Sequence, residues 1–132
     1  MTTPDPLSIR RLYGRAQGHP LRANAQRLVD ELLPSLTVPE DGSLSAMRLF
    51  GDERPLVFEV GFGKGEHLAF QAALRPDRGF IGAEPYLNGV AGLLAEAEAR
   101  GLSNLRIHRG DAIDVLERLP DASLEALYLL HP

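Results

Sequence analysis

The sequence predicts an α/β fold in which a parallel β-sheet carries helices on both faces. Short apolar runs alternate with segments of helical periodicity along residues 56–132. Such alternation implies parallel strands joined by right-handed crossovers. A glycine-rich turn, Gly61 to Gly65, follows the first apolar run. In sheets of this type ligands bind outside the carboxyl ends of the strands, where the strand order reverses. The turn marks that place.

The N-terminal part of the chain is basic, whereas the rest is acidic. Residues 1–28 contain five arginines and one acidic residue, and the remaining chain contains 9 basic and 17 acidic residues. Arg10, Arg11 and Arg15 are therefore candidate contacts for nucleic-acid phosphates. A solvated terminus is the alternative interpretation.

One amphipathic helix follows the arm. Apolar residues recur at helical spacing from Leu21 to Leu33, and Pro34 is expected to end a helix that packs against the sheet. Pro, Glu, Asp, Gly and Ser then dominate residues 37–55, as expected of a loop that serves as a hinge. The predicted organisation is an arm with its helix at 1–36, a linker at 37–55 and the α/β unit at 56–132.

Within the α/β unit, each element has its own signal. The run Leu56 to Val60 suits a strand buried on both faces of a parallel sheet, and Gly101 stands where a helix would be capped. Strands are expected at 56–60, 79–83, 105–108 and 124–130. Helices are expected at 66–74, from Pro85 or shortly after it to Gly101, and within 115–119.

Composition excludes several classes of site. The chain has 132 residues, the size of one domain, and it has no cysteine, which excludes disulfides, cysteine-based zinc sites and thiol nucleophiles. The four histidines are too scattered to predict a metal site, and each is interpreted as a structural or surface residue. No apolar window approaches the length of a membrane span. A soluble, cytoplasmic protein without a metal is expected.

The segment from Glu59 to Glu66 favours a ligand of the nucleotide type. Its alternating glycines, Gly61, Gly63 and Gly65, let a ligand approach the backbone closely, although an ordinary strand-to-helix turn would also use them. A dinucleotide fingerprint would place glycine where Glu66 stands, and carboxylates at Glu59 and Glu66 would repel a pyrophosphate. S-adenosylmethionine has no phosphate and carries a sulfonium and an ammonium group, so acidic residues favour it.

Two further acids stand at strand ends. Glu84 lies 25 residues after Glu59 and ends the second strand, where a carboxylate accepts hydrogen bonds from the ribose hydroxyls of an adenosine. Asp111 follows the third strand, where it could accept from an adenine amino group or cap the next helix. Spacing alone leaves both roles of Asp111 open.

These residues resemble a known family. The block from Phe58 to Gly65, the run Phe80 to Glu84, the segment Gly101 to Arg106 and the pair Asp111-Ala112 look like successive blocks of the bacterial tRNA (guanine-N7-)-methyltransferases. The run Tyr13 to Gly18 is similar to an arginine-glutamine-glycine signature near their N-terminus. The resemblance covers roughly residues 10 to 132.

The resemblance implies a Rossmann-like class I fold and transfer of a methyl group from S-adenosylmethionine to N7 of guanosine 46 in tRNA. It assigns Glu59 and Gly61 to the methionyl end of the cofactor and Glu84 to the ribose. It assigns Asp111 and Ala112 to the adenine. Gly63 belongs to the same cofactor-binding turn, and the arginines of the arm are candidate tRNA contacts. Monomer and homodimer both stay open.

The resemblance also implies that the fold is interrupted after its fourth strand. In the family, that strand runs into a Pro-Asp-Pro-Trp-Pro-Lys motif whose aspartate is catalytic, and the corresponding aspartate would come next after Pro132. Residues 56–132 would then be the N-terminal half of the methyltransferase domain, inactive by itself, with the fourth strand as a bare apolar edge. The alternatives are a methyltransferase acting on another substrate, a non-catalytic RNA-binding fragment and an NAD-dependent oxidoreductase, the last disfavoured by Glu59 and Glu66.

Overall fold

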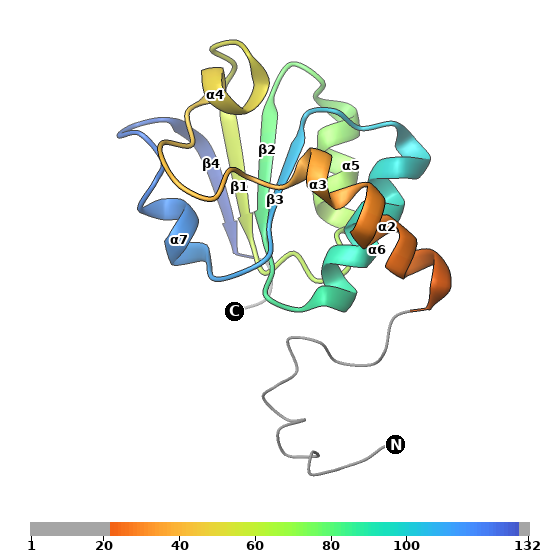
Figure 1. Cartoon of the computed structure of the whole chain (residues 1–132). Coiled ribbons are helices and arrows are strands. Elements are labelled where there is room, and N and C mark those ends of the chain that lie inside the picture. Colours follow the sequence, from red (N-terminus) through yellow and green to blue (C-terminus); the bar gives the residue numbers. More distant parts are fainter. Residues whose placement is uncertain (1–21, 130–132) are drawn as a thin grey trace.

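The computed structural model describes residues 22–129, which form an α/β unit around one four-stranded parallel sheet (Figure 1). The strands are β1 (Leu56–Val60), β2 (Gly79–Ala83), β3 (Leu105–His108) and β4 (Leu124–Leu129). Their order across the sheet is β3-β2-β1-β4, and every pairing is parallel. The predicted fold class is confirmed.

Helices cover both faces of the sheet (Figure 1). The crossovers β1 to β2 and β2 to β3 run through α5 (Glu66–Leu74) and α6 (Leu87–Arg100), which share one face. The crossover from β3 to β4 runs through α7 (Ala112–Leu116) on the opposite face. Because the chain changes face when it returns across the sheet, the strand order reverses between β1 and β4.

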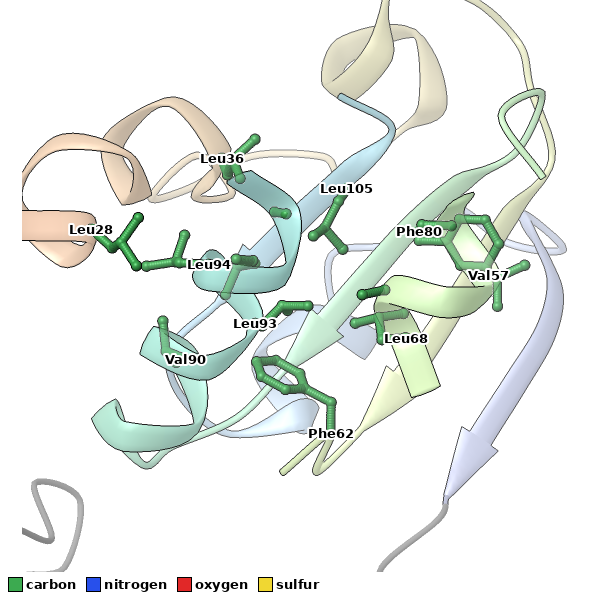
Figure 2. Packing of buried hydrophobic residues seen from close by; sticks show 14 residues of the cluster. Leu28, Leu36, Val57, Phe62, Leu68, Phe80, Val90, Leu93, Leu94 and Leu105 are labelled. Carbon is green, nitrogen blue, oxygen red and sulfur yellow. The ribbon is translucent and has the colours of Figure 1, made fainter. Parts of the chain in front are cut away.

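Two apolar cores follow from this layering. On the first face, Val57 and Phe80 of the sheet pack with Leu68 of α5 and Leu93 of α6 (Figure 2). On the second face, Phe58, Ile81 and Val115 are buried together. Strands β1 and β2 are apolar at consecutive positions, apart from Glu59 in β1, because both of their faces are covered.

The N-terminal helix differs from its prediction in two ways. It is divided into α2 (Ala23–Glu31) and α3 (Leu33–Leu36), and Pro34 lies in the first turn of α3 instead of ending the pattern. Proline is favoured there because the first helical N–H groups have no intrahelical partner. In addition, α2 packs on α6 with Leu28 buried, and Arg27 pairs with Glu98 at 2.8 Å, so a helix separates α2 from the sheet.

Residues 37–55 are more ordered than the loop that their composition predicts. They contain the short helix α4 (Ala46–Phe50), which Ser45 caps by accepting from the N–H of Arg48. The Val38 N–H donates to the Ile107 carbonyl of β3, and Leu44 is fully buried. The segment therefore packs as part of the α/β unit. Helix α7 also begins earlier than its expected range of 115–119.

Strand β4 is an edge of the described sheet. Within residues 22–129 it pairs with β1 alone, and Leu127 and Leu129 are 45% and 63% exposed on the face opposite α5.

No helix in the described part of the chain is long and apolar enough to cross a membrane. Arg10, Arg11 and Arg15 lie outside the described residues.

Candidate functional site

The candidate site lies at the carboxyl ends of β1 and β2, beside the place where the strand order reverses. The register pairs Glu59 with Gly82 and Val60 with Ala83, so the two strands end at the same level. The turn after β1 therefore lies beside Glu84, the residue after β2. The Gly61 N–H donates to the Ala83 carbonyl at 2.9 Å and continues the pairing into the turn.

The glycine turn has a backbone conformation that residues with a Cβ rarely adopt. Gly61, Gly63 and Gly65 have φ values of 64°, 63° and 83°, all in the left-handed region. The Gly65 N–H donates to the Phe62 carbonyl at 2.9 Å and closes the turn, after which α5 begins at Glu66. Three residues at alternate positions therefore require glycine for the same conformational reason.

Helix α6 approaches this turn closely because it presents small residues to it. A Cβ on Gly89 would collide with the Gly63 carbonyl oxygen, and a Cβ on Gly92 would lie 2.9 Å from the Lys64 carbonyl oxygen. A Cβ on Gly65 would in turn lie 2.6 Å from the Cβ of Leu93. The turn is therefore held between the sheet and the N-terminal half of α6.

Glu84 connects the end of β2 to the turn. Its side chain accepts hydrogen bonds from two backbone N–H groups, Gly63 to Oε1 at 2.9 Å and Tyr86 to Oε2 at 3.2 Å. Glu84 is 5% exposed, so these bonds compensate part of the cost of burying a carboxylate. The residue fixes the turn and the entry to α6 at the same time.

Glu59 is more deeply buried and less completely satisfied. It is 1% exposed, and its Oε1 lies 2.7 Å from Nδ1 of His67 in the first half of α5. Its Oε2 is buried and has no hydrogen-bond partner within the described part of the chain. A buried acceptor without a donor indicates that a donor group belongs next to it.

Asp111 and Ala112 lie at the end of β3 in a different environment. Asp111 is exposed, and its Oδ1 accepts from the Ile113 N–H at 3.0 Å, which caps the N-terminus of α7. Of the two roles left open by the sequence, the cap is confirmed. Contact with an adenine stays a prediction. Nearby, His108 and Asp114 pair at 3.1 Å.

The described residues hold no metal-binding cluster. No group of three or more histidine or acidic side chains between residues 22 and 129 is placed to hold an ion. The acids near the strand ends instead form hydrogen bonds with backbone N–H groups and with one imidazole.

Comparison with known proteins identifies the family to which the chain belongs. A family model described as "Putative methyltransferase" matches residues 53–132, which include all four strands and the glycine turn. The chain belongs to this methyltransferase family. It is a family of S-adenosylmethionine-dependent enzymes.

Curated relatives carry more specific names. Proteins named tRNA (guanine-N(7)-)-methyltransferase are 60% identical in Zymomonas mobilis and 57% identical in Erythrobacter litoralis, each matching 97% of this chain and 55% of its own length. The protein of the same name from Caulobacter vibrioides is 42% identical over the whole chain and 58% of its own length. The chain spans a little more than half the length of these curated relatives.

The sequence analysis did not predict the roles of His67 and of the two glycines of α6. His67 follows Glu59 by eight residues, just past the turn, and this proximity was an available signal. Gly89 and Gly92 are three residues apart, the spacing of one helix face, which is a signal for close approach of another backbone.

Proposed function

We propose that this chain forms the cofactor-binding part of an enzyme that methylates N7 of guanosine 46 in tRNA, with S-adenosylmethionine as methyl donor. The observation that carries the proposal is the pair of buried carboxylates, Glu59 and Glu84, on either side of the glycine turn where the strand order reverses. The names of the curated relatives support the choice of tRNA guanine.

The residues fit the proposed cofactor. The unpartnered Oε2 of Glu59 requires a donor, and the ammonium at the methionyl end would supply one together with a favourable charge. Glu84 uses one acceptor site on each oxygen for the backbone, and a carboxylate has about four such sites. Acceptor capacity therefore remains for ribose hydroxyls. A pyrophosphate would meet the negative charge of both residues.

The cofactor would supply an activated methyl group, and the residues of this chain bind and orient it. Glu59 with Gly61 would hold the methionyl end, Gly63 and Glu84 the ribose side, and Asp111 with Ala112 the adenine. N7 of guanine has a lone pair and no proton, so its attack on the methyl carbon needs no strong base. The contribution of the protein is positioning. The curated relatives extend well beyond the part that this chain matches. We assign the guanine-holding residues to the part that this chain does not match.

The proposal includes a partner and a location. The tRNA phosphates would be contacted by Arg10, Arg11 and Arg15 of the basic arm, and such contacts weaken steeply with added salt. Since tRNA is the substrate, the protein would act in the cytoplasm.

Methyl transfer by the complete enzyme of which this chain is the proposed cofactor-binding part tests the proposal. The protein is incubated with methyl-labelled S-adenosylmethionine and a tRNA transcript, and N7-methylguanine is mapped by chemical cleavage at the modified base. We expect one product at guanosine 46 and none in a transcript with adenosine there. Label at another nucleotide would overturn the assigned position. Calorimetric binding of NAD in preference to S-adenosylmethionine would overturn the methyltransferase assignment at this site.

A further inference from the structure

The contact between Glu59 and His67 joins the most deeply buried acid of the site to a partly exposed imidazole. The Glu59 side chain is 1% exposed and that of His67 is 38% exposed, and Nδ1 lies 2.7 Å from Oε1. His67 is the one side-chain hydrogen-bond partner of Glu59 within residues 22–129. The imidazole therefore stands between solvent and a carboxylate that solvent does not reach.

This hydrogen bond restrains the orientation of the carboxylate. Because the imidazole holds one oxygen, intermediate rotations about the last side-chain bond of Glu59 would weaken the bond, and the other oxygen stays available to a second donor. The donor must be the Nδ1–H group, since a carboxylate oxygen only accepts. The contact thus selects the tautomer of His67 with its proton on Nδ1.

The imidazole is held on a second side by β4. Tyr128 meets the His67 ring edge-on, with centroids 5.6 Å apart and planes inclined by 79°. The register places Tyr128 directly beside Glu59, because β4 pairs with β1 across the switch point. The His67 ring, which belongs to α5, therefore contacts residues of both β1 and β4. These two contacts restrain its orientation.

We propose that His67 is a positioning residue of the cofactor site, which holds Glu59 so that Oε2 accepts from the ammonium group of the methionyl moiety. The inference rests on the proposed function, because it needs a cationic amino-acid group at Glu59. In this arrangement His67 acts through Glu59 and does not touch the cofactor.

Two substitutions separate the hydrogen bond from the bulk of the ring. His67→Asn places an amide N–H where Nδ1 stands, whereas His67→Leu removes the donor and keeps an apolar side chain. We expect His67→Leu to raise the Kd for S-adenosylmethionine by about 10- to 100-fold, as for loss of a hydrogen bond to a charged group, and His67→Asn to stay within about threefold of the unaltered protein. Calorimetric titration measures both.

The matched control is His108, which also pairs its imidazole with a carboxylate, that of Asp114. His108→Leu removes a more exposed imidazole–carboxylate pair away from Glu59, and it should raise the Kd much less than His67→Leu does. Thermal unfolding of each variant verifies that it is folded. Equal weakening by His67→Leu and His108→Leu, or tight binding by folded His67→Leu, would overturn the inference.

A measurement without cofactor tests the contact itself. Nitrogen-15 chemical shifts report which imidazole nitrogen carries the proton, and we expect the Nδ1–H form of the neutral ring at His67. Glu59→Gln should shift the population toward the Nε2–H form, because the amide no longer demands a donor at that position. An unchanged tautomer would overturn the inference even if cofactor binds. Failure of the unaltered protein to bind S-adenosylmethionine, with the tautomer as expected, would instead overturn the proposed function and with it the role of Oε2.

Discussion

The acids at the ends of β1 and β2 differ from the acid at the end of β3. Glu59 and Glu84 are buried, whereas Asp111 is exposed and caps α7. All three lie at or near the carboxyl ends of parallel strands, Glu59 inside β1 and the other two after β2 and β3, so the topology alone does not predict their burial. The difference is in what surrounds each carboxylate. Glu59 contacts His67 of α5 and Glu84 accepts from the glycine turn, whereas Asp111 lies at the exposed start of a five-residue helix.

A buried carboxylate needs hydrogen-bond donors, and the donors to Glu84 show that it has a structural role in addition to the proposed binding role. Glu84 holds the backbone of Gly63 and Tyr86, so one side chain both shapes the turn and offers remaining acceptor sites to a ligand. Asp111 satisfies a local helix terminus, and such a residue is expected in proteins with or without a ligand. Burial therefore distinguishes Glu84, whose hydrogen bonds shape the glycine turn, from Asp111, whose hydrogen bond caps a helix.

Removing Glu84 should produce the largest effect. Glu84→Ala leaves the N–H groups of Gly63 and Tyr86 without their acceptor, and each such loss costs about 1–3 kcal/mol when water does not replace it. We expect a fall of about 2 kcal/mol or more in the free energy of unfolding, measured by urea denaturation. Cofactor affinity should fall at least tenfold.

The matched variant Glu84→Gln keeps one carbonyl acceptor and the shape of the side chain. It should recover part of the stability but little of the cofactor affinity. One carboxylate oxygen is replaced by an N–H₂ group, which cannot accept from a ribose hydroxyl or a backbone N–H. Equal stability of Glu84→Ala and the unaltered protein would mean that water replaces the carboxylate. Burial would then no longer distinguish Glu84 from Asp111.

Asp111 should show a smaller effect that follows helix capping. Asp111→Ala removes the acceptor for the Ile113 N–H and should lower the free energy of unfolding by about 1 kcal/mol, whereas Asp111→Asn retains a cap and should be nearly neutral. Denaturation of both variants measures this. If Asp111→Asn is stable but binds S-adenosylmethionine more weakly than the unaltered protein, the acid has a ligand role in addition to the cap.

The strands were predictable because their signals are local. Both faces of β1 and β2 are covered, so these strands are apolar at nearly every position, with Glu59 the exception, and their bounds match the prediction. Helix α4 escaped prediction because five residues carry no periodicity, and the segment is held by buried Leu44 and Leu49. Pro34 was misjudged because a proline that ends one helix equally suits the first turn of another.

The candidate site was predictable only in part, for a related reason. The glycines of the turn and the acids at strand ends stand at fixed positions relative to their strands, so sequence order predicts them. The partners of Glu59 depend on tertiary structure. Tyr128 reaches His67 only because β4 lies beside β1, and the strand order across the sheet is not encoded by any local pattern.

An exposed ion pair at the other end of the sheet should show the smallest effect and gives the comparison its lower limit. The Arg78 guanidinium donates to Glu125 at 3.0 Å and lowers the pKa of that carboxyl below its usual 4.5. Since the pKa of Glu125 is depressed by folding, the pair contributes stability above pH 4.5 and loses it as the pH falls through the folded pKa. Because the group is solvent-exposed, we expect Glu125→Gln to lower the melting temperature slightly at neutral pH and low salt, and not at all in acid or at about 1 M salt. If urea denaturation gave Glu125→Gln as large a fall in the free energy of unfolding as Glu84→Ala, the exposed pair would stabilise the fold as much as a buried acid.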